Sequence, residues 1–571
     1  MKLLRLRLDN SFRSLPAGFQ LIFRENNSGL QENLNEPICL VGINGSGKSN
    51  ILEALGEIFS YLDQTFLKFV NKHSDSPLIN SFELEYLLPF AGDMEFITSD
   101  NDIKIDTEFI HIKIVKLIDA LPSFYWFYNN EERTIVVGME SVLPKRIIGY
   151  SSGQNELLSI PFTKIKFRYY NTLLQEFKST YRDNVDYSRL RYIDYEENSN
   201  ILLANFLMAK NNEADVLKET ILVDDIDSFE LVINRNKNKR GTLPIDVDID
   251  KLLIFFESKS TDKVVIAPNI IRHIFTHIKD LKKDLQNNFV DAAGLYTLFK
   301  RLGYLNLNFV DKGKIDDLLV SNIEIYNNYD LTDFTPINRL FQISEVKIKK
   351  TNIDYPINYK NLSDGEHQFI HVIGTLLIFK EETSLFLFDE PETHFNPQWK
   401  YEYTEIFKKV TNSHKSQIIM TTHDPVLISG LSKENVIVFN KPNHGIERTY
   451  KPDKDLKGMG VDAILTSEIF GLNTTLDSGT LNEMIELRTL LLKKQNLEIN
   501  KEEQERYFEL YEKLKGIDFA EPLNDPMYRD FLNAKKELSV YSKPILTEKE
   551  NQLKNEVAKK IMETIKEKYT Q

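Results

Sequence analysis

The sequence predicts an α/β fold in which a parallel sheet carries a phosphate-binding loop, with a mixed α/β insertion in mid-chain and a helical C-terminal region. Three observations support this prediction. A glycine-rich phosphate-loop pattern follows a short apolar run at 37–41. Apolar runs of strand length return at 385–388, 417–420 and 435–439, separated by helical lengths. After about residue 475, apolar residues recur at helical spacing, as shown by Tyr507, Leu510, Tyr511 and Leu514.

Length and composition exclude several classes of protein. The chain has 571 residues, 42% hydrophobic and 27% charged, which is enough for a large core and too long for one compact domain. The one cysteine, Cys39, excludes an internal disulfide and favours a reducing compartment. No apolar run is long enough for a signal peptide or a membrane span, so we expect a cytoplasmic protein. The net charge of −14 repels nucleic acid at long range, so binding it would need a local basic patch or a dimer groove.

The N-terminal segment has the pattern of two kinds of strand. Leu4, Leu6 and Leu8 alternate with charged residues, which is the period of a half-buried strand. A second strand at 19–23 is expected to pair with it as an edge ribbon. The run 37–41 is apolar, which is typical of a buried central strand.

The pattern G-x-x-x-x-G-K-[ST] is matched at every position of residues 42–49, between that apolar run and a helical run at 50–59. Glycines let backbone N–H groups turn inward around phosphates, Lys48 places its charge on the β- and γ-oxygens, and Ser49 can ligate Mg²⁺. We therefore expect ATP and Mg²⁺ as cofactors at this Walker A loop. The residues expected to contact the nucleotide are Asn44, Gly45, Ser46, Gly47, Lys48, Ser49 and Asn50.

Two adjacent carboxylates follow the apolar run 384–388, at the kind of strand end where open parallel sheets bind ligands. Asp389 is expected to hold Mg²⁺, and Glu390 to polarise the water that attacks the γ-phosphate. A further apolar run, 417–420, leads through two threonines to His423. Together with the phosphate loop, this pattern indicates ATP hydrolysis.

Between the loop and these carboxylates, the chain resembles the ABC-type ATPases, whose signature L-S-x-G-x-x-Q is matched at Leu362, Ser363, Gly365 and Gln368. In that family the signature of one subunit completes the phosphate site of another. The resemblance therefore implies a head-to-tail dimer or higher oligomer in which Ser363 and Gly365 contact the nucleotide. It also implies that His423 is the switch histidine, which makes the expected catalytic residues Glu390, His423 and Lys48.

The spacing of the motifs separates this chain from transporter subunits of that family. Lys48 and Ser363 are 315 residues apart, and such an insertion resembles the RecF, SMC and OLD branch, in which the inserted part clamps or senses DNA. The segment 389–397 is similar to that branch's D-E-P-E-x-x-L-H-P, with departures at Phe395 and Asn396. No role is carried over for the motif histidine that Asn396 replaces.

Residues 1–15, the phosphate loop and residues 148–156 are together most similar to the bacterial restriction system-associated AAA family ATPases. More distantly, the head resembles the PtuA ATPases of the Septu defence system. Gln154 is the candidate for the Q-loop glutamine of these families, which contacts the nucleotide site. The resemblance is specific over the ATPase core and only general over the insertion and the tail.

We expect four regions. Residues 1–160 form the N-terminal lobe with Walker A, and 161–340 form an α/β-helical insertion that acts as a sensor or clamp. Residues 341–475 form the C-terminal lobe with the signature, Walker B and His423, and 476–571 form a helical partner-docking region. Within the insertion, a hairpin around 234–241 and a helical stretch at 270–302 are predicted. Two basic clusters are candidates for phosphate contact: Arg235, Lys237, Lys239 and Arg240, and then Lys347, Lys349 and Lys350.

These features predict a Mg²⁺-dependent ATPase of a bacterial antiphage or restriction-type defence system, in which ATP-driven dimerisation controls a separate effector. OLD-type relatives carry a nuclease domain after the ATPase. Because no acidic cluster of that form follows His423, we predict no intrinsic nuclease and expect a nuclease as the separate subunit. The alternative is a RecF-like DNA-repair ATPase, which neighbouring replication genes would favour. A module that binds ATP without turnover is disfavoured, since Asp389, Glu390 and His423 are all present.

Overall fold

A computed structural model gives the fold of this chain. It divides the chain into two units, Met1–Asp453 and Lys454–Gln571. The four predicted regions, with boundaries at 160, 340 and 475, stay a prediction. The structure describes all residues except 26–35, 67–77, 91–107, 130, 154–155, 177–187, 195–196, 211–212, 237–244, 290, 310–338, 381–382, 412–414, 441–447, 473, 496, 515–552, 554–555, 562 and 564–571.

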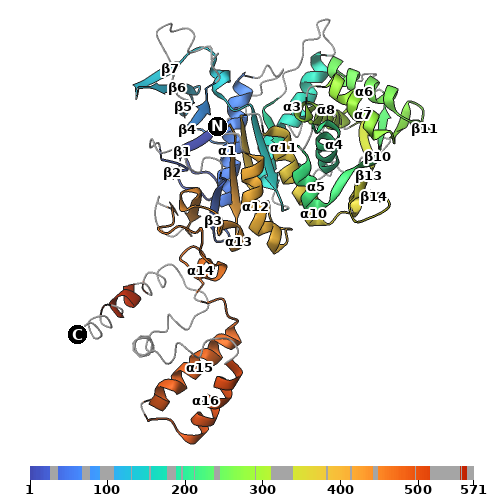
Figure 1. Cartoon of the computed structure of the whole chain (residues 1–571). Helices are drawn as coiled ribbons and strands as arrows, with labels where there is room; N and C mark the ends of the chain where they lie inside the picture. Colours follow the sequence, from blue (N-terminus) through green and yellow to red (C-terminus); the bar gives the residue numbers. More distant parts are fainter. Residues whose placement is uncertain are drawn as a thin grey trace. The chain divides into compact units, whose positions relative to one another are not determined.

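A seven-stranded sheet lies at the centre of the first unit (Figure 1). In chain order its strands are β3 (Ile38–Gly42), β8 (Arg146–Ser151), β9 (Leu190–Tyr192), β15 (Ser384–Asp389), β16 (Gln417–Thr422), β17 (Val436–Phe439) and β18 (Thr449–Tyr450). The spatial order is β18-β17-β3-β16-β15-β8-β9, and all pairs are parallel except β17 with β18. Strands β3, β15, β16 and β17 are buried along their whole length, as apolar strands covered on both faces are. The four predicted apolar strands are confirmed.

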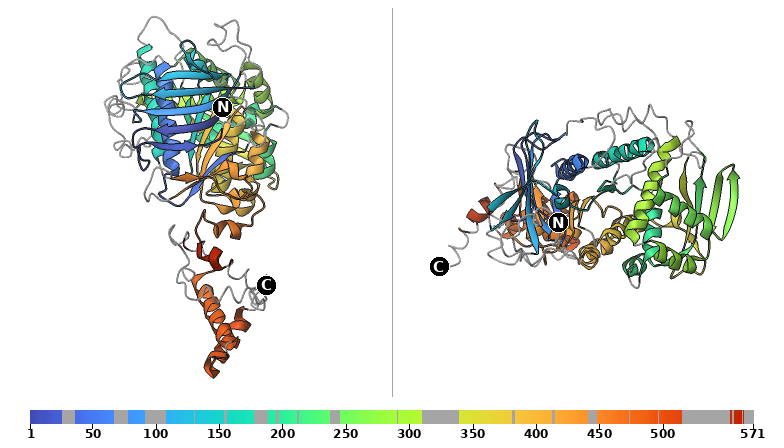
Figure 2. Two further views of the ribbon diagram at one scale, coloured as in Figure 1. Left: turned by 90° about the vertical axis from the view of Figure 1, so that its left-hand side faces the viewer. Right: turned by 90° about the horizontal axis from the view of Figure 1, so that it is seen from above.

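A second, antiparallel sheet has six strands, which lie side by side in the left view of Figure 2. Its order is β2-β1-β4-β5-β6-β7, so the predicted pairing of the first two strands is confirmed. Arg5 on β1 forms ion pairs with Glu83 and Glu85 on β4. The bounds are β1 (Lys2–Leu8), β2 (Phe19–Ile22), β4 (Phe82–Pro89), β5 (Phe109–Lys116), β6 (Ser123–Tyr128) and β7 (Glu131–Ile135).

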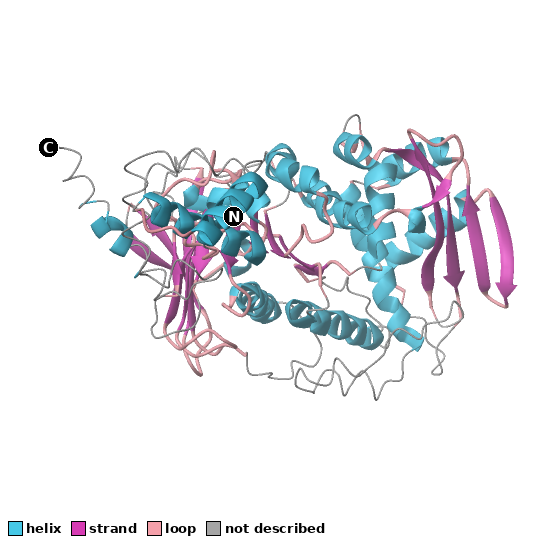
Figure 3. Ribbon diagram, turned by 90° about the horizontal axis from the view of Figure 1, so that it is seen from below, coloured by secondary structure: helices cyan, strands magenta, loops and turns pink. Residues whose placement is uncertain are grey.

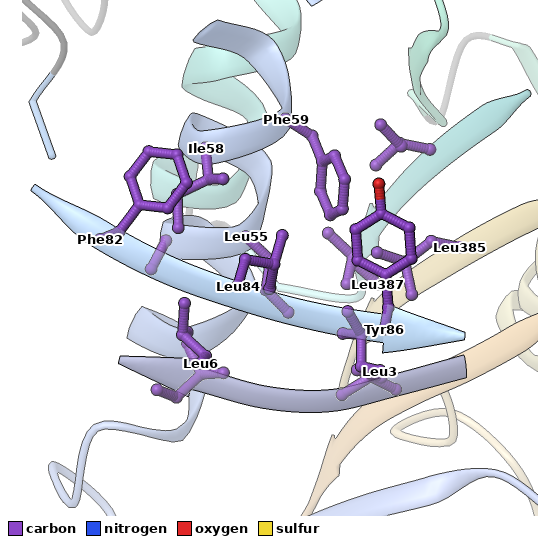
Figure 4. Close-up of a cluster of buried hydrophobic side chains, with 14 of the residues drawn as sticks. Leu3, Leu6, Leu55, Ile58, Phe59, Phe82, Leu84, Tyr86, Leu385 and Leu387 are labelled. Atoms are coloured by element: carbon purple, nitrogen blue, oxygen red, sulfur yellow. The ribbon is translucent and has the colours of Figure 1, made fainter. Parts of the chain in front are cut away.

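Helix α1 (Lys48–Phe66) joins the two sheets through one apolar core. Figure 4 shows side chains of α1 meeting those of β1, β4 and β15. Burial of such aliphatic and aromatic side chains stabilises the fold by about 25 cal/mol per Å² of apolar surface. This core therefore fixes the start of α1, and with it the phosphate loop, against the central sheet. The labelled core residues are Leu3, Leu6, Leu55, Ile58, Phe59, Phe82, Leu84, Tyr86, Leu385 and Leu387.

The insertion consists of a layer of helices and its own antiparallel sheet. In Figure 3 the helices lie between this sheet and the other two sheets. The helices are α3 (Ile160–Glu176), α4 (Asn198–Met208), α5 (Asp215–Ile221), α6 (Val247–Lys259), α7 (Ile278–Asn288) and α8 (Ala292–Leu305). The sheet order is β11-β12-β10-β13-β14. Its strands are β10 (Val223–Asn234), β11 (Asp262–Ala267), β12 (Ile270–Phe275), β13 (Phe341–Lys350) and β14 (Ile357–Asn358).

One prediction for the insertion was wrong. Residues 270–275 form strand β12 rather than the start of a helix, because their branched residues pair with β10 and β11. Most of the hairpin predicted around 234–241 lies outside the described residues, so it stays a prediction. Residues Lys237, Lys239 and Arg240 lie outside the described residues.

The signature region is helical. Helix α10 (Asp364–Phe369) continues into a π-helical turn (Ile370–Gly374) and then α11 (Thr375–Phe379). Two more helices follow the strands that carry the carboxylates and His423: α12 (Pro397–Val410) and α13 (Pro425–Ile428). The segment that follows Ser363 is therefore helical up to Phe379, with one π-helical turn inside it.

The second unit holds α14 (Val461–Leu465) and a pair of helices, α15 (Ser478–Gln495) and α16 (Lys501–Leu514). The predicted stripe of α16 packs on α15, with Tyr507, Leu510 and Leu514 buried against Leu487 and its neighbours. No helix among the described residues is both long and apolar enough to cross a membrane.

Candidate nucleotide-binding site

The phosphate loop begins at Gly42, where β3 ends. Gly45 and Gly47 have φ angles of 77° and 104°, in the left-handed region that residues with a Cβ rarely adopt. A Cβ on Gly47 would lie 2.9 Å from Ser14 Oγ, and one on Gly42 would lie 2.4 Å from the backbone oxygen of Phe439. The geometry of the loop therefore requires glycine at these positions.

Lys48 opens α1 and turns back onto its own loop. Its Nζ donates to the carbonyl oxygens of Gly42 at 2.9 Å and Ile43 at 3.2 Å. Burial lowers the pKa of Lys48 to about 8, and the carboxylates after β15 oppose that shift. The buried hydroxyl of Ser46 has no hydrogen-bond partner among the described residues. A partly desolvated ammonium and an unpartnered hydroxyl on one loop fit a site that receives a phosphate group.

Ser49 and Asp389, the two expected magnesium ligands, are hydrogen-bonded to each other. Ser49 Oγ donates to Asp389 Oδ1 at 2.8 Å, and Thr421 Oγ1 donates to the same oxygen at 2.5 Å. Burial raises the pKa of Asp389, and the two hydroxyl donors act against that rise. One carboxylate and one hydroxyl side by side are the oxygen ligands that Mg²⁺ takes in phosphate sites. These two residues would therefore hold the ion next to the loop.

Glu390 is held in a strained backbone conformation, with φ of 49°. Its backbone N–H donates to the Thr421 carbonyl at 3.3 Å and to Thr421 Oγ1 at 3.1 Å. His423 Nε2 lies 3.1 Å from Glu390 Oε1. This hydrogen bond is the main reason why the pKa of Glu390 lies below its usual value. Glu390 is thus an ionised and partly exposed carboxylate, which suits a group that accepts a proton from water.

The signature residues lie at the start of α10. They are not part of the hydrogen-bonded group formed by Ser49, Asp389, Glu390 and His423. Ser363 is an exposed N-cap, and its backbone N–H and hydroxyl donate to Glu366 at 2.8 and 2.9 Å. A Cβ on Gly365 would lie 2.8 Å from the carbonyl oxygen of His394. Gln368 accepts a hydrogen bond of 2.8 Å from the backbone N–H of His394. The signature helix is therefore fixed against the segment that follows Glu390, while Ser363 stays accessible.

The remaining predicted residues lie around the loop. Asn44 is exposed on it, and Asn50 Nδ2 donates to Ser14 Oγ at 2.7 Å. Gln154 lies outside the described residues, but Ser152 N donates to the carbonyl of Asp389 at 3.1 Å. The 148–152 stretch therefore ends beside the carboxylates.

Sequence reasoning missed three residues of this site. Ser14 borders the phosphate loop from the turn between β1 and β2, and no local pattern marks it. Thr421 binds both Asp389 and the backbone of Glu390, and its position at the end of an apolar strand could have revealed it. Glu392 is fully buried and accepts a hydrogen bond from Thr422.

Glu392 gives a pH-dependent prediction. Burial raises its pKa to about 8. A carboxyl with a raised folded-state pKa contributes its full stability below the unfolded-state pKa, and loses it as pH rises through the folded-state value. We expect Glu392→Gln to reduce the fall in melting temperature between pH 5 and pH 8. Thermal melts across that range, with exposed Glu405→Gln as the control, measure this effect, and equal slopes for both variants would contradict it.

The parallel sheet and its phosphate loop together define an α/β protein of the P-loop ATPase class. Residues 171–429 match the family described as "AAA domain, putative AbiEii toxin, Type IV TA system". This match begins after the phosphate loop and includes Ser363, Asp389, Glu390 and His423. Over 170 residues the chain is 31% identical to the Septu protein PtuA of Bacillus mycoides (strain KBAB4). The aligned part is 28% of this chain and 23% of that protein.

Solved structures of SMC heads are also similar to this chain. The Pyrococcus yayanosii Smc head with a coiled coil and joint is 13% identical, with coverage of 81% of this chain and 98% of that chain and a TM-score of 0.29. The SMC head domain from Thermotoga maritima is 11% identical, with coverage of 75% of this chain and 91% of that chain and a TM-score of 0.25. These scores are low, so the fold assignment rests on the central sheet and its loop.

Proposed function

We propose that this chain is a Mg²⁺-dependent ATPase of a bacterial antiphage or restriction-type defence system, in which ATP-driven dimerisation of the heads controls a separate nuclease. The observation that carries the enzymatic part is the group of side chains at the C-terminal end of β15. Asp389 there meets Ser49 of the phosphate loop, and Glu390 meets His423. A binding site without turnover would not need an ionised carboxylate paired with a histidine at that place.

Each side chain has a role in hydrolysis. The loop backbone and Lys48 bind the β- and γ-phosphates, and Ser49 and Asp389 hold the ion. Glu390 accepts a proton from the attacking water, and His423 orients Glu390 through the 3.1 Å contact. Bound Mg·ATP supplies the phosphoryl group and the charge that offsets its negative oxygens.

The accessible signature supports a head-to-tail dimer. Ser363 caps its helix with an exposed hydroxyl, which could turn from Glu366 to donate to a phosphate of a second head. In this arrangement each head completes the site of the other. ATP binding then joins the heads, and hydrolysis separates them.

The defence assignment rests on the likeness to the Septu protein PtuA and to the AbiEii-type AAA domain. The α15/α16 pair offers a surface for the effector, with Leu497 92% and Phe508 51% exposed. Three of the four described basic residues are paired with carboxylates, which does not favour the RecF-like alternative, whereas Lys347 is exposed. Arg235 is paired with Asp250 and Glu257, and Lys349 and Lys350 are also paired with carboxylates.

Lys48→Ala tests the first step of the proposed function, which is the binding of ATP. We expect this variant to lose ATP affinity by about 10- to 100-fold, because a charge-assisted contact to phosphate disappears. Lys347→Ala, which removes an exposed lysine of β13, is the matched control and should bind normally. Isothermal titration with Mg·ATP measures both. Equal affinity of Lys48→Ala and wild type, or no ATP binding by wild type, would overturn the proposed function.

A further inference from the structure

Helix α4 of the insertion is hydrogen-bonded to the signature helix at two points. Asn198 Nδ2 lies 2.9 Å from His367 Nδ1 and donates to the His367 carbonyl at 3.2 Å. Further along α4, Asn205 Nδ2 donates to the carbonyl of Gly374 at 3.0 Å. Both asparagines are buried, so each of these contacts forms away from water. Loss of a buried donor leaves its partner unsatisfied, which makes such contacts strong positional constraints.

The second contact lies at an irregular part of the signature helix. The π turn Ile370–Gly374 separates α10 from α11, and single π turns inside α-helices are frequent at functional sites. Asn205 binds the last residue of this turn and also donates to the carbonyl of Ile201 on its own helix at 2.9 Å. A Cβ on Gly374 would lie 2.7 Å from Ile201 Cγ2. Close packing and the amide together fix the register of the signature helix against α4.

Helix α4 is itself tied to the central sheet. Glu197, just before its first residue, is paired with Lys300 of α8 and accepts a 2.6 Å hydrogen bond from the hydroxyl of Tyr296. Lys300 also donates to the carbonyl of Tyr192, the last residue of β9. Strand β9 is the edge of the seven-stranded sheet. The insertion therefore links the sheet edge to the signature helix through α4 and Lys300.

The π turn also contacts β8, the strand next to the one that carries the carboxylates. Its His371 ring lies 5.8 Å from the Tyr150 ring on β8, measured between ring centroids. Tyr150 in turn packs at 6.2 Å against Phe388, the residue before Asp389. The same turn thus contacts α4 and, through Tyr150, the residue before Asp389.

We propose that Asn198 and Asn205 are positioning residues through which the insertion sets the place of Ser363, and so controls the closing of two heads. This inference rests on the proposed function, since it concerns the signature of the same ATPase. A ligand of the insertion that moves α4 would then change dimerisation without touching the phosphate loop. In this way, a signal sensed by residues 161–340 would reach the signature helix through the contacts of α4.

Asn205→Leu tests the inference, because leucine keeps the approximate size but removes the donor. The matched control is Asn308→Leu, another buried amide of the insertion, whose Oδ1 accepts from Tyr170 at 3.2 Å. Both changes are made in wild type and in a Glu390→Gln background. We expect Asn205→Leu to keep the ATP affinity of the monomer and to weaken ATP-driven dimerisation about tenfold, with a matching fall in kcat. Asn308→Leu should leave dimerisation unchanged.

Analytical ultracentrifugation with ATP measures dimerisation, and titration at low protein concentration measures monomer affinity. Asn198→Ala provides the same comparison at the other contact if Asn205→Leu does not fold. If wild type binds and hydrolyses ATP but neither variant differs from Asn308→Leu, the inference is overturned and the proposed function stands. If wild type neither binds nor hydrolyses ATP, the proposed function fails first, and the inference falls with it.

Discussion

Glu390→Gln is expected to lower the rate of ATP hydrolysis by about 10²- to 10⁴-fold, the usual contribution of a positioned general base. Glutamine has the same shape as glutamate but cannot accept the proton of the attacking water. The backbone contacts to Thr421 do not involve the side chain, so the strained conformation with φ of 49° is retained. ATP affinity should therefore stay close to that of wild type, because Lys48 and Ser49 are unchanged.

The same variant should accumulate as an ATP-bound dimer, since joining of the heads continues while their separation by hydrolysis stops. Phosphate release and the mass in solution with and without Mg·ATP measure the two effects. Glu405→Gln on α12 is the control, because that side chain is 67% exposed and pairs with Lys408 of the same helix. Wild-type turnover by Glu390→Gln would remove Glu390 from the catalytic role and leave the phosphate loop assignment intact.

The sequence was sufficient to predict the centre of this molecule. A phosphate loop needs glycines and a lysine at fixed spacing, and the strand before it must be apolar because both faces are covered. Both features are local, so they can be identified without the fold. The strand that delivers Asp389 and Glu390 could be predicted for the same reason, and β15 indeed lies next to β16 and β8.

The insertion was harder because its structure depends on distant pairing. Residues 270–275 contain branched residues that suit a strand, yet an apolar run of that length next to a helical sequence also fits a helix. Its pairing with β10 decides between the two, and that contact joins residues about forty positions apart. Ser14 was missed for a related reason, since it meets Gly47 and Asn50 only through the fold.

The head-to-tail arrangement predicts that two inactive variants restore each other. Ser363→Asp keeps an N-cap residue, so helix α10 should persist, but its negative charge opposes a phosphate of the partner head. Lys48→Ala lacks phosphate binding in its own head yet retains Ser363. In a mixed dimer, the site formed by Lys48 of the Ser363→Asp chain and Ser363 of the Lys48→Ala chain is intact.

Random mixing of the two variants should recover about a quarter of the wild-type rate, because half of the dimers are mixed and each has one working site. Each variant alone should be inactive, whereas Ser363→Thr, which keeps the hydroxyl cap, should be active. Steady-state hydrolysis of mixtures at several ratios measures the recovery, with its maximum at equal amounts. A mixture no faster than its separate components would show that Ser363 does not act across the dimer, even if ATP still joins the heads.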